Sequence, residues 1–283
     1  MKGEHAPSVH HIVHMRYKIG FIGGGNIATS ILGGLIDSSL YQKNDIIVSD
    51  RLETSLNHLK ENYGVETTQD NEMLVKNSEI VLIAVKPHLV DSVLTPLMPH
   101  FTIDQLIISV AAGITTDTLR QYFKEGTLLY RVMPNTPAKV RAGMSVIFSD
   151  ANDQTPSLKT VRAIFEAVGR VEVMDESLVH ACIAVQGSSP AYMFMVLEAM
   201  GDAAVRLGLP RDKAYNMAAQ SMLGSALMLL ESQSHPGVLK DMVTSPKGTT
   251  IDAVASLEAS GLRDSFIKAM TACAEKSEAM SKK

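Results

Sequence analysis

The sequence has 283 residues, a formal net charge of −4, 46% hydrophobic residues and 20% charged residues. This composition is typical of a globular protein, and at roughly 150 residues per domain the length predicts two domains. The weak net charge argues against a nucleic-acid-binding protein. Cys182 and Cys273 form no CxxC motif, which excludes a disulfide framework and favours a reducing compartment, the cytoplasm. Unbroken apolar runs such as residues 80–85 are too short to span a membrane.

Residues 1–14 differ from the rest of the chain, because they carry four of its nine histidines and have no apolar periodicity. A secretory signal peptide would need a continuous apolar core of about 7–15 residues. A metal-binding tract is one interpretation of the histidines. We favour a vector-derived leader that precedes a native start at Met15.

From residue 18 onward, short apolar runs alternate with longer amphipathic segments. Near-continuous apolar runs are typical of strands buried on both faces of a parallel sheet. Strands are predicted at residues 19–22, 46–49, 80–85, 106–110, 128–132, 144–148 and 171–174. Helices are predicted at residues 26–38, 53–62, 70–77, 89–98, 116–123 and 156–168. The alternation predicts the α/β class, with a doubly wound sheet of the Rossmann type.

After residue 175 the alternation stops, and only helices are predicted. They cover residues 178–207, with a kink near Pro190, and then 211–230, 236–242, 250–259 and 262–281. Several of these helices are apolar nearly all round, and a domain of about 105 residues cannot bury them alone. We therefore expect an intertwined homo-oligomer, with domains at residues 15–176 and 177–283.

A glycine-rich string follows the first predicted strand and opens the first predicted helix. It reads Gly23-Gly24-Gly25-Asn26-Ile27-Ala28 and matches the dinucleotide fingerprint G-x-G-x-x-A. Such glycines let the backbone approach a pyrophosphate, which then lies at the helix N-terminus. A glycine-rich turn without a ligand is the alternative, and the strand–turn–helix context favours the nucleotide.

The second predicted strand ends in Ser49, followed by Asp50 and Arg51. An acidic residue here usually binds the ribose 2′-hydroxyl of NAD, whereas a nearby arginine accommodates the 2′-phosphate of NADP. Arg51 after a small hydroxyl residue favours NADPH as the cofactor. Asp50 keeps NADH open as the alternative.

Three further segments follow the ends of predicted strands. They are Val85-Lys86-Pro87, Ala111-Ala112-Gly113 and the segment from Met133 to Pro137. The carboxyl ends of parallel strands share one edge of the sheet, and ligands bind at that edge. We expect these segments to lie beside the glycine-rich turn.

The last predicted helices are preceded by Ser245-Pro246-Lys247-Gly248-Thr249-Thr250-Ile251. A turn that leads into a helix presents unpaired backbone N–H groups. With three hydroxyl groups beside them, these donors could bind a carboxylate. The alternative is an ordinary helix cap made by Ser245 or Thr249.

Taken together, these strings resemble the pyrroline-5-carboxylate reductase family, which catalyses the last step of proline biosynthesis. The matching segments run from Met15 to the C-terminus in the order of the family, and Ser245 to Ile251 is the most specific of them. The others are residues 21–28, 84–87, 133–138, 187–192, 235–237 and 239–241. The resemblance implies an N-terminal Rossmann domain, a helical dimerisation and substrate domain, and a homodimer that can form decamers.

The resemblance also implies roles for individual residues. Ser245, Gly248 and Thr249 would bind the substrate carboxylate, and Thr250 would hydrogen-bond the ring nitrogen as the catalytic residue. No metal ion is expected. The expected cofactor-binding residues are Ile22, Gly23, Gly24, Gly25, Asn26, Ile27, Ser49, Arg51, Asn71, Ala84, Val85, Lys86, Pro87, Ala111 and Ala112.

The sequence departs from the family pattern at two positions. Lys247 stands where the family usually has glycine, and Gln186 where it usually has serine or threonine. If position 247 needs a positive φ, lysine is strained there. If not, its ammonium group could tighten carboxylate binding. Substrate affinity, rather than reaction type, depends on these departures, and another cyclic imine could be the preferred substrate.

Two other functions compete with this interpretation. A β-hydroxyacid-type dehydrogenase would carry a catalytic lysine on the long helix after the sheet, and residues 178–207 contain no lysine. A nicotinamide-binding scaffold without activity would bind the cofactor and not turn it over. The intact segment from Ser245 to Ile251 argues against the scaffold.

Overall fold

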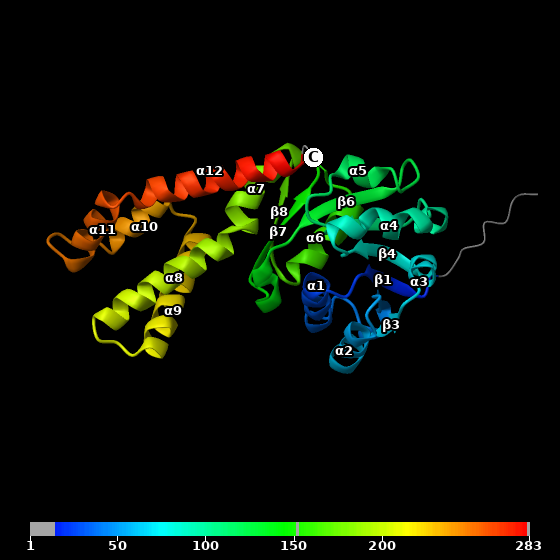
Figure 1. Ribbon diagram of the computed structural model, residues 1–283, viewed down its shortest axis with the longest axis horizontal. Coiled ribbons are helices and arrows are strands. Elements are labelled where there is room, and N and C mark those ends of the chain that lie inside the picture. Colours follow the sequence, from blue (N-terminus) through cyan, green and yellow to red (C-terminus); the bar gives the residue numbers. More distant parts are fainter. Residues whose placement is uncertain (1–14, 151–152, 282–283) are drawn as a thin grey trace, which may run out of the picture. The chain divides into compact units, whose positions relative to one another are not determined.

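The computed structural model describes residues 15–150 and 153–281, so the expected leader at residues 1–14 lies outside the described residues. The chain divides into two compact units, Met1–Leu178 and Val179–Lys283 (Figure 1). The first unit is built on a sheet, and the second is entirely helical in its described residues. We call them the sheet unit and the helical unit.

Eight strands form one sheet in the order β3-β2-β1-β4-β5-β6-β7-β8. Neighbouring strands are parallel, except that β6 and β7 are antiparallel. This is the doubly wound Rossmann arrangement, in which the strand order reverses beside β1. The strands are β1 Tyr17–Ile22, β2 Ile46–Ser49, β3 Glu66–Thr68, β4 Ser78–Ile83, β5 Leu106–Ser109, β6 Leu128–Met133, β7 Gly143–Phe148 and β8 Gly169–Met174.

Helices cover both faces of this sheet (Figure 1). Successive strand residues face opposite sides, so Ile46 and Val48 join one hydrophobic cluster and Ile47 joins the other. The first cluster includes α1 and α6, and the second includes α3, α4 and α5. The helices of the unit are α1 Asn26–Asp37, α2 Glu53–Tyr63, α3 Asn71–Asn77, α4 Val90–Leu94, α5 Thr116–Arg120 and α6 Pro156–Glu166.

The sheet unit departs from the sequence prediction in three places. Strand β3 was not predicted, because its Glu-Thr-Thr sequence is polar and only half-buried at the sheet edge. The helix expected at residues 89–98 is short, with α4 between the 3-10 turns Pro87–Leu89 and Thr95–His100. Pro96 and Pro99 lie in that last turn, where proline cannot donate to a helix. Helix α5 ends at Arg120, three residues earlier than expected.

The helical unit contains α7 Val179–Cys182, α8 Ser189–Arg206, α9 Arg211–Ser232, α10 Pro236–Met242, α11 Thr249–Ala259 and α12 Leu262–Ser281. The helix expected at residues 178–207 is interrupted by one π-helical turn, Ile183–Gly187, just before Pro190. The interruption falls where the proline indicated a kink. π-Turns of this kind occur often at functional sites.

The helical unit buries little of its own apolar surface. Its buried apolar residues are small or peripheral, and they are Val179, Cys182, Ala184, Ala214 and Ala218. Phe194 and Met195 on α8 are 67% and 70% exposed. A surface of this kind is typical of an interaction site.

Candidate functional site

The glycine-rich turn lies between β1 and α1 and is held by its neighbours. The Gly23 N–H donates to the Ser49 carbonyl at 2.8 Å, and the Ala84 N–H donates to the Ile22 carbonyl at 2.8 Å. Gly23 has φ +103, and a Cβ there would lie 2.7 Å from the Ala84 oxygen. Only glycine fits this position, and the turn therefore passes directly beside the end of β4.

The turn leaves an open, electropositive end on α1. Gly25 is the N-cap residue, no side chain caps the helix, and a Cβ at Gly25 would meet nothing within 4 Å. Unpaired N–H groups and the helix dipole favour an anion here. A hollow of about 710 Å³ adjoins the turn, lined by Gly24, Gly25 and Asn26 and by Leu52, Thr54 and Ser55 after β2. This arrangement fits the pyrophosphate of a dinucleotide.

The Asp50 side chain, directly after β2, accepts hydrogen bonds from two backbone N–H groups of the protein. Its Oδ2 accepts from the Gly24 N–H at 2.8 Å, and its Oδ1 accepts from the Leu52 N–H at 2.9 Å. Both oxygens therefore fix backbone on either side of the hollow. Arg51, the next residue along the chain, is exposed.

Ser49 and Asn71 lie together, but only Asn71 is partly accessible. The Ser49 side chain is 1% exposed, and its hydroxyl lies 2.6 Å from the Asn71 Oδ1. Asn71 is the first residue of α3. Ser49 is thus placed to orient Asn71, rather than to contact a ligand directly.

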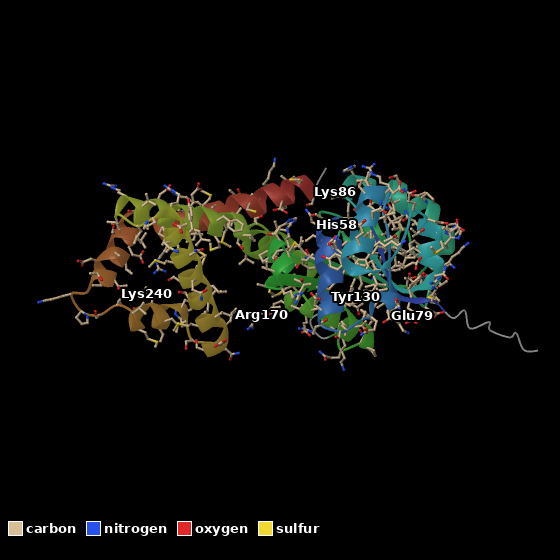
Figure 2. All side chains as sticks on the ribbon, turned by 90° about the horizontal axis from the view of Figure 1, so that it is seen from below. His58, Glu79, Lys86, Tyr130, Arg170 and Lys240 are labelled. Atoms are coloured by element: carbon tan, nitrogen blue, oxygen red, sulfur yellow. The ribbon has the colours of Figure 1, made fainter. Side chains whose placement is uncertain are left out.

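The segments after β4 and β5 lie at the same sheet edge as the glycine-rich turn. The Val110 N–H donates to the Ile83 carbonyl at 3.0 Å, which joins the two strand ends. Ala111 is buried, whereas Ala112, Lys86 and Pro87 are exposed. Lys86 follows the end of β4, and Figure 2 shows it well away from Glu79, which lies at the start of that strand. The expected cofactor residues of the sheet unit thus surround one edge.

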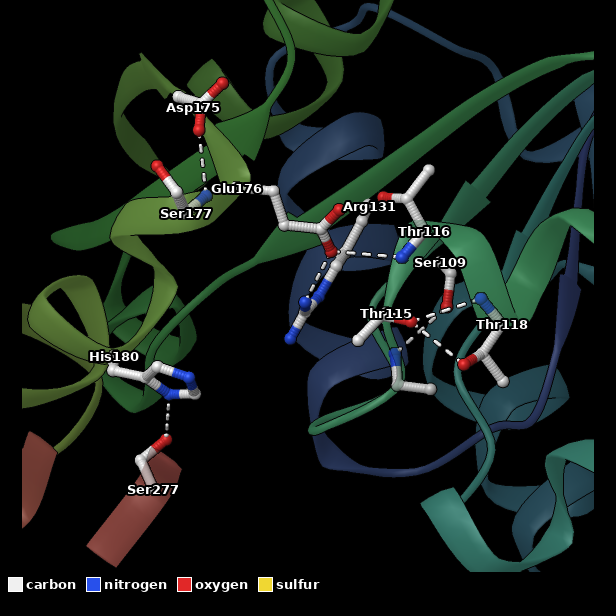
Figure 3. A network of polar contacts seen from close by, with 11 residues as sticks. Ser109, Thr115, Thr116, Thr118, Arg131, Asp175, Glu176, Ser177, His180 and Ser277 are labelled. Carbon is white, nitrogen blue, oxygen red and sulfur yellow. Dashed lines mark hydrogen bonds and ion pairs between the residues drawn. The ribbon is translucent and has the colours of Figure 1, made fainter. Parts of the chain in front are cut away.

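One polar cluster at this edge was not anticipated from the sequence. Arg131 Nη1 donates to Glu176 Oε1 at 2.6 Å, and the Thr116 N–H donates to the same oxygen at 3.0 Å (Figure 3). The Arg131 guanidinium also lies 5.2 Å from the centre of the Phe148 ring. Burial raises the pKa of Glu176, but the hydrogen bonds from Arg131 and Thr116 outweigh it and hold this pKa below its ordinary value.

In the helical unit, the segment from Ser245 to Gly248 forms a tight turn before α11. The Gly248 N–H donates to the Ser245 carbonyl at 3.0 Å. Gly248 is the N-cap residue of α11, and no side chain caps the helix. The ordinary cap by Ser245 or Thr249 is therefore not made. The backbone donors at the start of α11 and the exposed hydroxyls of Thr249 and Thr250 remain open to an anion.

Lys247 is in the left-handed region, with φ +59. With Pro246 before it and the Ser245–Gly248 hydrogen bond around it, the turn has the pattern of type II, which favours glycine at this position. Lysine costs about 1–2 kcal/mol in that conformation. Position 247 therefore does need a positive φ, and lysine is strained there.

Other candidate residues have structural partners. His180 Nδ1 lies 2.9 Å from the Ser277 Oγ (Figure 3), and His235 Nδ1 accepts from the Gly237 N–H at the start of α10. Burial raises the pKa of the Cys182 thiol, so this cysteine is unreactive. Gln186 is 6% exposed and lies in the π-helical turn.

The described residues also bear on metal binding and on membrane insertion. Within residues 15–150 and 153–281, no group of three or more His, Cys, Asp or Glu side chains is placed to hold a metal ion. Among the helices of that same part of the chain, none is both long and apolar enough to cross a membrane.

The chain is similar to known proteins along nearly its whole length. A family model described as pyrroline-5-carboxylate reductase dimerisation matches residues 176–280, and one described as NADP oxidoreductase, coenzyme F420-dependent, matches residues 18–113. Pyrroline-5-carboxylate reductase from Escherichia coli K12 is 44% identical over 95% of this chain and 100% of the relative. The enzyme of the same name from Methanosarcina acetivorans is 42% identical over 94% of this chain and 98% of the relative.

Solved structures agree with these sequence matches. A pyrroline-5-carboxylate reductase from Coxiella burnetii has a TM-score of 0.88 and 38% identity, and the match covers 95% of this chain and 100% of that one. Pyrroline carboxylate reductase from Plasmodium falciparum with NADP bound has a TM-score of 0.81 and 28% identity. This match covers 94% of this chain and 99% of that one.

Proposed function

The chain belongs to the pyrroline-5-carboxylate reductase family, and from that membership we propose how its own residues hold the cofactor and the substrate. It is an NAD(P)H-dependent oxidoreductase that reduces the C=N bond of 1-pyrroline-5-carboxylate and gives proline. The observation that carries the substrate assignment is the turn before α11, where uncapped backbone donors and free hydroxyls meet.

The cofactor would lie along the carboxyl edge of the sheet. Its pyrophosphate would lie along residues 22–27, at the end of α1 that no side chain caps, and the N–H groups of Asn26 and Ile27 would face it. Asn71 would contact the adenosine side, with Ser49 behind it. The nicotinamide half would lie against Ala84, Val85, Lys86 and Pro87 and against Ala111 and Ala112. The joined ends of β4 and β5 support this placement.

We propose NADPH as the preferred cofactor. Both oxygens of Asp50 accept backbone hydrogen bonds, which leaves this carboxylate poorly placed to bind a ribose 2′-hydroxyl. Arg51 is exposed and directly precedes Leu52, which lines the hollow, so its guanidinium can meet a 2′-phosphate. The Plasmodium relative has NADP bound, which is consistent with this choice.

Replacing Arg51 tests the preference. Arg51→Ala should lower kcat/KM for NADPH about tenfold to a hundredfold, since a hydrogen bond to a charged group contributes about 1.5–3 kcal/mol. The value for NADH should stay within about twofold, because NADH lacks the 2′-phosphate. An equal loss for both cofactors would contradict the assignment.

The substrate carboxylate would bind to Ser245, Gly248 and Thr249 at the start of α11. The backbone donors there suit a carboxylate, because they are oriented by the turn and need no rearrangement. The Thr250 hydroxyl, one residue along the helix, would then hydrogen-bond the ring nitrogen. Together they would hold the carboxylate and the ring nitrogen of the substrate in fixed positions.

The reaction needs little acid or base from the protein. When bound, the reduced nicotinamide supplies a hydride to the C=N carbon, and the electron pair of the double bond goes to the nitrogen. A protonated imine already accepts hydride readily, so the residues mainly orient the substrate and exclude water. Thr250 serves as a hydrogen-bonding residue that holds the ring nitrogen in position. The product nitrogen is an amine and keeps that contact.

We propose a homodimer in the cytoplasm as the working form. The match of residues 176–280 to a dimerisation family and the exposed apolar side chains of α8 support the dimer. Cys182 and Cys273 are both free, as a reducing compartment would leave them. Further association into decamers is part of the same proposal, and light scattering on the purified protein distinguishes the two assemblies.

The direct experiment follows the loss of absorbance by reduced nicotinamide in the presence of 1-pyrroline-5-carboxylate, with NADPH and NADH in parallel. Proline formation with NADPH favoured would support the whole proposal. Turnover with NADH favoured would overturn the cofactor preference alone. Tight NADPH binding without turnover would point to Lys247 and to a different cyclic imine.

A further inference from the structure

Arg131 is the single charged residue among those buried in residues 15–150 and 153–281, and the proposed mechanism gives it no role. A buried guanidinium needs partners, because removing a charge from water costs several kcal/mol unless it is paired. Its partner, Glu176, lies 45 residues further along the chain and three residues before the helical unit begins.

The Glu176 carboxylate does more than neutralise this charge. The oxygen that accepts from Arg131 at 2.6 Å also accepts from the Thr116 N–H at 3.0 Å (Figure 3). Thr116 is the first residue of α5, directly after the loop at residues 110–115. One carboxylate oxygen therefore joins β6 to the far end of that loop.

The near end of the loop is fixed by β5. The Ala111 N–H donates to the Ser109 hydroxyl at 3.3 Å, and Ser109 is the register partner of Arg131 in the β5–β6 pair. Between these ends, Ile114 packs against the second hydrophobic cluster, and the Thr115 hydroxyl accepts from the Thr118 N–H at 3.1 Å. Ala112 and Gly113 are exposed, and Gly113 has φ +76.

We propose that Glu176, together with Arg131, is a positioning residue for the nicotinamide end of the cofactor, because it fixes the loop that carries Ala111 and Ala112. This inference rests on the proposed function, which places the nicotinamide half against that loop. Hydride transfer needs the reacting atoms about 3–3.5 Å apart, so a shift of about 1 Å in the loop would misplace the nicotinamide. The adenosine half, at the other side of β1, would not be affected.

The competing explanation is that the ion pair only stabilises the sheet unit. These two roles differ in which ligand they affect. A general loss of structure weakens binding of every part of the cofactor, whereas a displaced loop weakens only the nicotinamide half. Two ligands therefore separate them: NADPH, and 2′,5′-ADP, which carries the adenosine half alone.

The experiment measures both dissociation constants by calorimetry on the full-length protein. Glu176→Ala removes the acceptor of both hydrogen bonds, and we expect the Kd of NADPH to rise about tenfold, the equivalent of one typical hydrogen bond. Glu176→Gln keeps an acceptor oxygen, and we expect the Kd of NADPH to rise only about threefold in this variant. The Kd of 2′,5′-ADP should change less than twofold in both variants.

Glu79→Gln provides a matched control. Glu79 accepts from Lys18 at 2.7 Å, but this pair is exposed at the start of β4, far along the strand from Lys86 (Figure 2). Neither ligand should bind more weakly to this variant. A second readout is the kinetic isotope effect with 4-deuterated NADPH, which should increase in Glu176→Gln, because a misplaced nicotinamide makes hydride transfer more rate-limiting.

Two results would overturn the inference: equal weakening of both ligands, or unchanged NADPH binding in both Glu176 variants. Ala112→Leu distinguishes this failure from failure of the proposed function. If Ala112→Leu weakens NADPH and the Glu176 variants do not, the nicotinamide lies on the loop but Glu176 does not position it. If Ala112→Leu weakens neither ligand, the placement of the nicotinamide itself is wrong.

Discussion

In the sheet unit, both hydrophobic clusters are closed within the chain. Its strand ends are joined by backbone hydrogen bonds and by the ion pair of the buried Arg131 with the partly exposed Glu176. The helical unit is the opposite. Its large apolar side chains, such as Phe194 and Met195, are exposed, and the turn before α11 leaves its donors open. The difference agrees with the proposal that the sheet unit holds the cofactor, whereas the helical unit pairs with a second copy of the chain.

The largest expected effect comes from breaking the surface of the helical unit. Phe194→Glu should convert the dimer to a monomer, because burial of each Phe194 side chain contributes about 1.5–3 kcal/mol and a dimer contains two. Light scattering and the concentration dependence of the thermal midpoint measure this. Val140→Glu, at a 73% exposed position of the sheet unit, is the control and should leave the dimer intact. An intact dimer in Phe194→Glu would place the interface elsewhere.

The next effect concerns the closed network of the sheet unit. Glu176 has a lowered pKa in the folded protein, so its charge stabilises the fold above its unfolded pKa of about 4.3, and this contribution is lost as the pH falls through the folded value. Urea denaturation should therefore show wild type about 1–3 kcal/mol more stable than Glu176→Gln at pH 7. The difference in free energy of unfolding between the two proteins should become smaller below a pH of about 4. A gap that is independent of pH would show that the charge is not what stabilises the fold.

A smaller set of contacts tests the open turn of the helical unit. Thr250→Ala should lower kcat/KM for 1-pyrroline-5-carboxylate about tenfold to a hundredfold, since it removes one directional hydrogen bond of about 1–3 kcal/mol. Thr250→Ser keeps the hydroxyl and should retain most of the activity. Steady-state rates at saturating NADPH measure both variants. Equal activity of Thr250→Ala and wild type would remove Thr250 from the mechanism.

The smallest expected effect is at Lys247. Lys247→Gly should raise the free energy of unfolding by about 0.5 kcal/mol, because relief of the left-handed strain exceeds the greater freedom of glycine in the unfolded chain. The strain does not remove the ammonium group, so Lys247→Gly should also raise KM for the substrate, because a positive charge beside the carboxylate is lost. Gln233→Gly is a matched control, since Gln233 has φ +54 after α9 and lies outside the turn. Gln233→Gly should stabilise the fold by a similar amount and leave KM for the substrate unchanged.

The sequence predicted most strands of the sheet unit, because buried parallel strands leave a strong apolar signal. The glycine-rich turn was predicted for a similar reason, since Gly23 has a backbone conformation that side chains rarely adopt. Gly64 ends α2 with φ +67, so this glycine likewise marks the end of a helix. Signals of this kind depend on one residue and its near neighbours.

What could not be predicted depends on residues far apart in the chain. The antiparallel direction of β7 relative to β6 leaves no trace in its composition. The use of Asp50 to hold the Gly24 N–H requires two segments 26 residues apart to meet. Arg131 did offer a signal, because an arginine inside an apolar strand needs a buried partner. Nothing local to Glu176 identifies it as that partner.

The two units are joined by a single passage of the chain, at Leu178 and Val179. The sheet is complete before that point, since β8 ends at Met174. In evolutionary terms, one recombination event at this joint can attach a new helical segment without cutting any strand. A sheet of this kind can therefore keep its cofactor while the attached helices, and the substrate they select, are exchanged.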